Sequence, residues 1–125
     1  MAVLPSAGRP RLSRIFKILA RAAWEEALEA GVYRGSAVDA ADGFIHFSTA
    51  AQAQETARRH FAGQTDLVVL AVDADALGTT LKWEPSRGGE LFPHLYGTLA
   101  PEQVIAVTDA PPGADGVPDV GDLAG

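Results

Sequence analysis

The apolar and polar positions near the start of the chain alternate as they do in a β-strand. Over residues 14–20 (RIFKILA), Phe16 and Ile18 fall on one face, and Lys17 lies between two aliphatic residues on the other. This pattern predicts a strand with two distinct faces.

Two later stretches have the spacing of helices. Over residues 22–31 apolar side chains recur at i, i+3, i+4 and i+7, and Gly31 is a natural helix stop. A second helix is predicted from Thr49, where Gln52 three residues later completes a capping-box pattern, to Gly63.

Short apolar runs between turn residues predict the remaining strands. They cover residues 44–48, 67–72, 79–84, 95–99 and 104–108, with a loop over 85–93. Strands outnumber helices and both main helices come early. We therefore expect an α+β fold, a small single domain with antiparallel or mixed sheets.

The length of 125 residues and mass of 13.1 kDa correspond to one domain. Both ends are rich in Pro, Gly, Ala and charged residues, with little to bury. We expect residues 1–13 to form a flexible N-terminal arm, residues 14–109 the globular domain, and residues 110–125 a disordered C-terminal tail.

Composition excludes several classes of protein. The absence of cysteine excludes disulfides and thiolate metal sites. A net charge of −6 without a basic stripe argues against duplex nucleic acid as a partner. No apolar run approaches the ~20 residues of a membrane span, and no signal peptide opens the chain, so we expect a cytoplasmic protein.

The first segment with candidate chemistry is residues 42–49 (DGFIHFST). Alternation places His46 and Ser48 on one face, at a strand end that leads into the helix beginning at Thr49. Unpaired N–H groups in the first turn of a helix suit an anion. The alternative is a buried histidine that a backbone carbonyl satisfies, with Ser48 or Thr49 acting only as a helix cap.

The second segment is residues 83–97, which place polar groups among aromatic ones. Its candidate ligand-binding or catalytic residues are Trp83, Arg87, Gly88, Gly89, Glu90, His94 and Tyr96. Glycine lets the backbone approach a ligand closely, and arginine offers a charged fork for phosphate or carboxylate. The alternative is an ion pair from Arg87 to Glu84 or Glu90 that braces a glycine loop.

Two further candidates are less specific. Lys17 is either an active-site cation or a lysine on an exposed strand face. His46, His94 and Glu90 would make a two-histidine, one-carboxylate metal set. None of the three histidines in the chain has the spacing of metal ligands, so we expect no metal.

The same residues resemble a bacterial family, the domain of unknown function 952. The resemblance covers about residues 14–108. It is carried by residues 14–19 (RIFKIL), by Trp24, by residues 31–35 (GVYRG), 42–48 (DGFIHFS) and 54–61, by Trp83 and Glu84, and by residues 87–97 (RGGELFPHLYG). It implies a fold similar to the ADP-ribosyltransferase group, with two antiparallel sheets around a cleft for a nicotinamide dinucleotide.

The resemblance also implies where the site residues of such enzymes fall. A basic residue on the first strand corresponds to Lys17, and the polar residues of a strand that leads into a helix correspond to His46, Ser48 and Thr49. The acidic residue on a late strand corresponds to Glu90 or His94.

We therefore expect an enzyme, or a decayed enzyme, that binds NAD, a related nucleotide or a phosphorylated sugar. Arg87 and the glycine amides would hold phosphate, while Trp83 or Tyr96 would stack on a base. Glu90, His46 and His94 would be catalytic, as acid, base or hydrogen-bonding groups. The alternatives are a non-catalytic module for a small acid or a protein, and a metal-dependent hydrolase.

Overall fold

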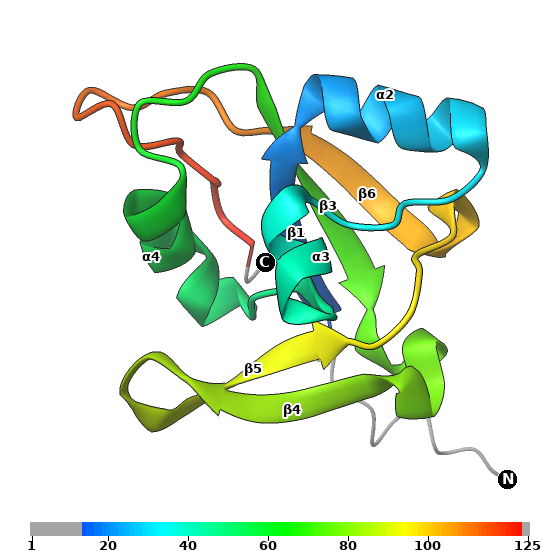
Figure 1. The fold of residues 1–125 in the computed structure, drawn as a ribbon. Helices are drawn as coiled ribbons and strands as arrows, with labels where there is room; N and C mark the ends of the chain where they lie inside the picture. Colours follow the sequence, from blue (N-terminus) through cyan, green and yellow to red (C-terminus); the bar gives the residue numbers. More distant parts are fainter. Residues whose placement is uncertain (1–13, 124–125) are drawn as a thin grey trace, which may run out of the picture.

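The structure is a computed structural model that describes residues 14–123. These residues form two three-stranded antiparallel sheets (Figure 1). In the first sheet, β3 (Leu67–Asp73) lies between β1 (Arg14–Ala20) and β6 (Val104–Asp109). In the second, β5 (Glu90–Leu95) lies between β2 (Ile45–His46) and β4 (Leu81–Ser86). The expected α+β class is confirmed.

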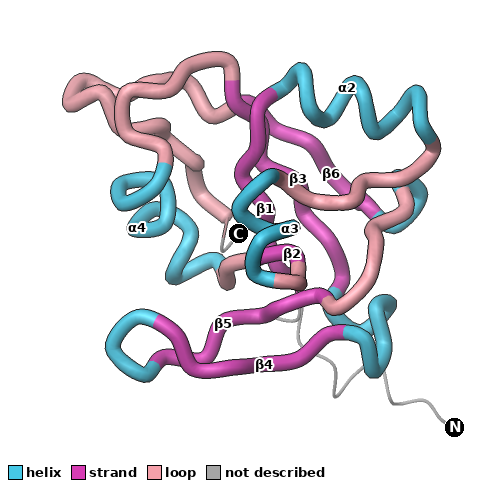
Figure 2. The backbone as a smooth tube through the Cα atoms, viewed as in Figure 1, coloured by secondary structure: helices cyan, strands magenta, loops and turns pink. Residues whose placement is uncertain are grey.

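Within residues 14–123, three α-helices and three 3-10 segments connect the strands, as the tube in Figure 2 shows by colour. The α-helices are α2 (Arg21–Ala30), α3 (Ala37–Asp42) and α4 (Ala50–His60). The 3-10 segments are η2 (Ala74–Thr80), η3 (Arg87–Gly89) and η4 (Pro101–Gln103). None of the helices between residues 14 and 123 is long and apolar enough to cross a membrane.

The two faces of β1 bury their side chains in separate clusters, as the alternation predicts. Ile15 and Leu19 join a core between the two sheets that also contains Trp24 of α2. Phe16 and Ile18 join a second cluster on the other face of the first sheet, where α4 packs. The first sheet is therefore covered on both faces, which explains the uninterrupted apolar sequence of β3.

The predicted loop over residues 85–93 is wrong, because these residues form a β-hairpin. β4 and β5 pair from Leu81 opposite Leu95 to Ser86 opposite Glu90. Pro85 is tolerated because β4 is an edge strand. Gly88 (φ 66°) and Gly89 (φ 87°) form the turn, so these two glycines are required by the backbone of the hairpin.

Two other predicted elements are also corrected. The strand expected over residues 95–99 ends at Leu95, and Leu99 makes only an isolated bridge to Tyr33. The sequence pattern predicts no helix between Gly31 and residue 44, but α3 forms there, and a capping box between Ser36 and Asp39 initiates it. The capping box predicted at Thr49 and Gln52 is present at the start of α4.

The segment that follows β6 packs against α4, contrary to the disordered tail expected over residues 110–125. Ala110, Val117 and Val120 are buried in the second cluster. The Gln54 amide of α4 fixes the segment by donating to the Pro118 carbonyl (2.8 Å) and accepting from the Val120 N–H (3.1 Å). A few apolar residues spaced among Pro, Gly and Asp therefore anchor this segment, while most of its other residues stay at the surface. The expected arm over residues 1–13, and residues 124–125, lie outside the described residues.

Because Val120 is 5% exposed, we expect Val120→Ala to lower the free energy of unfolding by about 2 kcal/mol through lost apolar burial. The matched control is Val38→Ala, since Val38 is 64% exposed and should change stability by less than about 0.5 kcal/mol. Urea denaturation followed by circular dichroism measures both. Equal stability of the two variants would contradict the packing of the C-terminal segment.

Candidate functional site

A buried carboxylate, Asp39 of α3, lies where β1, β2 and α3 meet. Its oxygens accept hydrogen bonds from Lys17 Nζ (2.9 and 3.2 Å), the Ser36 N–H (2.8 Å), the His46 N–H (3.2 Å) and His46 Nδ1 (2.6 Å). Gly35 leaves room for this arrangement, since a Cβ at that position would lie 2.7 Å from the Asp39 Cβ. One side chain thus positions Lys17 and His46 together.

The protonation of this centre follows from burial and from its partners. Burial raises the pKa of Asp39, but the hydrogen bond from His46, the charge of Lys17 and the Ser36 N–H outweigh burial and hold the pKa well below its ordinary value. Burial lowers the pKa of Lys17, and Asp39 opposes part of that change. Lys17, expected on an exposed face or in an active site, is therefore a buried partner of Asp39.

His46 is held between two carboxylates of the same helix. Its Nδ1 faces Asp39, and its Nε2 lies 2.9 Å from Asp42 Oδ2. An ionised carboxylate only accepts hydrogen bonds, so both ring nitrogens must carry a proton to satisfy both contacts. Each ring nitrogen of His46 is thus placed to donate to a carboxylate.

His94 has a different environment. It is 5% exposed, and its Nδ1 lies 2.8 Å from Glu84 Oε1, which also accepts a hydrogen bond from the Tyr96 hydroxyl (2.8 Å). The hydrogen bonds from His94 and Tyr96 hold the pKa of Glu84 below its ordinary value, so Nδ1 is the donor. Within the described residues Nε2 has no hydrogen-bond partner, which leaves it as the lone-pair nitrogen.

The two histidines are neighbours across the second sheet. His46 lies directly opposite His94 in the register of β2 and β5, with ring centroids 5.5 Å apart. The Phe44 ring stacks on His94 at 4.0 Å and also contacts the rings of His46 and Tyr96. We call this arrangement of Phe44, His46, Glu84, His94 and Tyr96 the histidine pair site.

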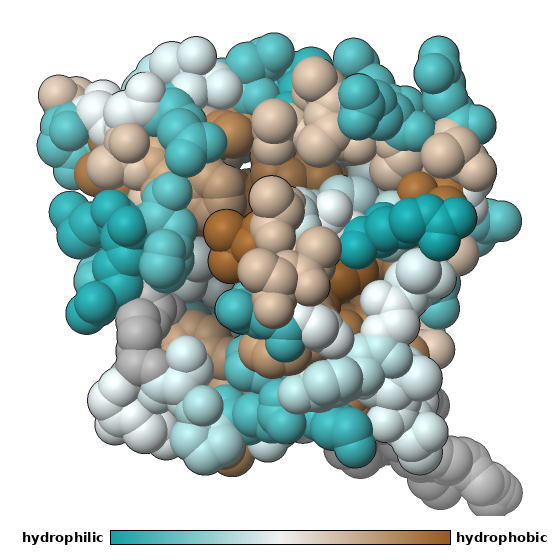
Figure 3. Space-filling view, in the orientation of Figure 1, coloured by the Kyte–Doolittle hydropathy of each residue, from teal (hydrophilic) through white to brown (hydrophobic). Residues whose placement is uncertain are grey.

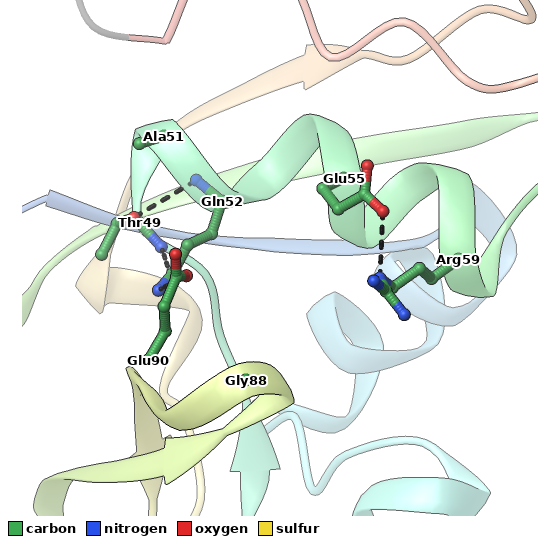
Figure 4. Close-up of a pocket in the computed structure, with 7 residues that line it drawn as sticks. All are labelled: Thr49, Ala51, Gln52, Glu55, Arg59, Gly88 and Glu90. Atoms are coloured by element: carbon green, nitrogen blue, oxygen red, sulfur yellow. Dashed lines mark hydrogen bonds and ion pairs between the residues drawn. The ribbon is translucent and has the colours of Figure 1, made fainter.

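A separate groove of about 480 Å³ lies between α4 and the tip of the β4–β5 hairpin (Figure 4). It is lined by Thr49, Ala51, Gln52, Glu55, Arg59, Gly88 and Glu90. The Gln52 amide crosses it to Glu90 Oε1 (3.2 Å) and to the Leu91 carbonyl (2.9 Å). Glu90 and His94 are four residues apart on one strand, which separates their Cα atoms by about 13 Å.

The structure therefore distributes the predicted site residues over several separate locations. His46, His94 and Tyr96 come together in the histidine pair site, whereas Thr49, Gly88 and Glu90 line the groove. The remaining candidates lie elsewhere. Ser48 is buried and its hydroxyl is hydrogen-bonded to that of Thr56 (2.8 Å), and Trp83 is on the opposite face of the hairpin from His94. Gly89 is in the hairpin turn, and the side chain of Arg87 lies outside the described part.

The structure adds carboxylates that sequence reasoning did not assign to the site. The sequence pattern assigns no role to Asp39 or Asp42, and it offers Glu84 only as a partner for Arg87. A signal for Asp39 was present, because Ser36 three residues earlier completes the Ser-x-x-Asp pattern of a helix start. Nothing local indicated that the carboxylate of Asp39 would also reach Lys17 and His46.

The metal set of His46, His94 and Glu90 is not assembled. The part of the chain described here contains no group of three or more His, Asp or Glu side chains placed to hold a metal ion. The distance of Glu90 from His94 along β5 is the physical reason. The hydrolase alternative therefore lacks its ligand set.

Comparison with known proteins identifies relatives of this fold. The model of a family described as "Protein of unknown function (DUF952)" matches residues 18–107. The crystal structure of protein CC0527 from Caulobacter crescentus is similar with 56% identity and a TM-score of 0.85, over 87% of this chain and 96% of that one. Its solution structure is similar with 55% identity and a TM-score of 0.79, over 88% and 95%. No curated protein matches.

We expect Asp39→Asn to lower the free energy of unfolding by about 3 kcal/mol or more, because it leaves Lys17 buried without a charged partner. Asp42→Asn on the same helix is the matched control. Asp42 is half exposed, so its loss should cost less than about 1 kcal/mol. Urea denaturation at pH 7 compares the two, and similar costs would rule out a buried ion pair at Asp39.

The same variant tests the pH dependence of stability. The pKa of Asp39 is lower in the folded than in the unfolded chain, so its contribution is complete at neutral pH and is lost as the pH falls below the ordinary carboxyl pKa of about 3.9. The stability difference between the native chain and Asp39→Asn should therefore shrink between about pH 5 and pH 2.5. A difference that stays constant over this range would contradict the assignment.

Proposed function

Because this chain belongs to the DUF952 family, which is described only as a family of unknown function, its role has to be inferred from the site. We propose that it is an enzyme that binds a nucleotide-like or phosphorylated-sugar ligand over the histidine pair site and transfers a proton through His94.

The orientation of His94 is the observation that supports this proposal most. A carboxylate that accepts from Nδ1–H fixes the tautomer, leaves Nε2 as a base and stabilises the imidazolium that forms when Nε2 takes a proton. Glu84 plays this part and is itself held by the Tyr96 hydroxyl. A buried histidine that served only to fill space would not need an ionised partner on a neighbouring strand.

The surroundings of His94 suit a ligand with a hydroxyl group and a planar ring. His94 Nε2 would accept the proton of a ligand hydroxyl or of a bound water, and Glu84 would stabilise the imidazolium that results. Phe44 and Tyr96 offer ring faces beside His94, and Tyr96 is 40% exposed. These features, with the resemblance to the ADP-ribosyltransferase group, favour NAD or a related nucleotide as the ligand.

The residues that line the groove are not part of the proposed catalytic site. Glu90 is too distant from His94 to act on the same atoms, so we do not assign it the catalytic role that the sequence predicts. Binding of phosphate near Gly88 and Thr49 stays a prediction for the groove.

We expect one ligand among NAD, ADP-ribose, cyclic nucleotides and sugar phosphates to raise the thermal midpoint. At 100 times Kd, binding adds about 2.7 kcal/mol, which corresponds to about 10 °C for a domain of this size. His94→Gln should abolish turnover of that ligand. His60→Gln, an exposed histidine in the last turn of α4, is the matched control and should leave turnover unchanged.

The outcomes separate this proposal from its alternative, a non-catalytic binding module. Binding without turnover in the native chain would favour the module. Turnover that survives His94→Gln would exclude His94 as the base. If no ligand shifts the midpoint at millimolar concentration, the nucleotide proposal fails.

A further inference from the structure

The contact between His46 Nε2 and Asp42 is the more exposed of the two that His46 makes. The Asp42 side chain is 49% exposed, whereas the Asp39 side chain on the other ring nitrogen is 2% exposed. His46 itself is 34% exposed. The ring is therefore anchored through Nδ1, and its Nε2–H is directed to a partner at the surface.

Asp42 also does not stabilise its own helix, α3. It is the last residue of α3, and a carboxylate at a helix C-terminus meets the negative end of the helix dipole. The last turn of α3 contains no basic residue that would offset this. Its contact with His46 is thus a half-exposed ion pair, of the kind that contributes little and that another anion can replace.

The register of the second sheet places a lysine on the other side of His94. Lys82 on β4 lies opposite His94, which lies opposite His46 on β2. Paired residues of antiparallel strands share a face, so Lys82 and His46 lie on either side of His94, with Cα atoms about 5 Å from that of His94. The Lys82 ammonium lies over the Tyr96 ring, 5.9 Å from its centroid. The face of the molecule over β4 and β5 is largely hydrophilic (Figure 3). A face that carries the Lys82 ammonium and the His46 N–H beside His94 suits a ligand with negative charge beside its reacting group.

We propose that His46 Nε2–H binds an anionic oxygen of the ligand, from a phosphate or a carboxylate, and that Asp42 occupies this position until the ligand displaces it. The inference rests on the proposed function in that it takes the histidine pair site to be where the ligand binds. In the histidine pair site, His46 is then the group that recognises the anion. It also gives the two histidines separate roles, His46 as the hydrogen-bond donor to the anion and His94 as the base.

The groups that face His46 support this assignment. Lys17 from β1 and Asp39 from α3 form a buried pair of opposite charge, and His94 and Phe44 present rings. Asp42 is the one group in this set that is both negatively charged and half exposed. Its displacement leaves His46 still fixed by Asp39, with Nε2–H open to an incoming anion.

The test is a titration with inorganic phosphate and, separately, with acetate, followed by NMR signals of the His46 ring. In the native chain either anion should shift the His46 signals. In Asp42→Ala the affinity for the anion that binds should rise about fivefold, because the internal competitor is gone. The anion with the higher affinity identifies the ligand group as phosphate or carboxylate.

Asp119→Ala is the matched control, since it removes the same charge from the exposed C-terminal segment and should leave the affinity unchanged. If Asp42→Ala fails to fold, Asp42→Asn serves the same purpose. An equal gain in Asp119→Ala, or His46 signals that neither anion moves, would overturn the proposal. His94→Gln should still bind the anion. Failure of the turnover test for the proposed function can therefore be distinguished from failure of anion binding at His46.

Discussion

The Asp39 carboxylate links three parts of the chain through its side chain: β1, the start of α3 and β2. It accepts from Lys17 on β1, from the backbone of Ser36 at the start of α3, and from both the ring and backbone of His46 on β2. A buried charge without partners is strongly destabilising, so the loss of any one of these partners is expected to lower the stability of the fold. The orientation of the His46 ring, and its place beside Lys17, therefore depend on this side chain.

Two histidines that look alike in the sequence therefore have different chemistry. His46 has both nitrogens engaged by carboxylates of α3, which suits a fixed hydrogen-bond donor. His94 has one nitrogen held by Glu84 and the other without a partner among the described residues, which suits a base. The difference arises from neighbours on other elements, and it assigns binding to one ring and proton transfer to the other.

Much of the fold follows from local patterns. The period of apolar residues located β1, β3, β6 and the two longer helices, and the capping box located the start of α4. The hairpin of β4 and β5 was missed because Pro85 and the two glycines of the turn are typical of loops. A proline is acceptable in β4 because β4 is an edge strand. The segment after β6 was missed because its few valines gain their burial only from α4.

Alternation along residues 44–48 was enough to separate His46 from the apolar residues beside it, because side-chain direction in a strand depends only on position. That His46 faces His94 depends on the register of β2 against β5, and that Lys17 reaches Asp39 depends on a contact 22 residues along the chain. Register and long-range ion pairs are set by how the whole core packs. Local periodicity carries no information about them, and for this reason the carboxylate partners of both histidines emerged only from the folded chain.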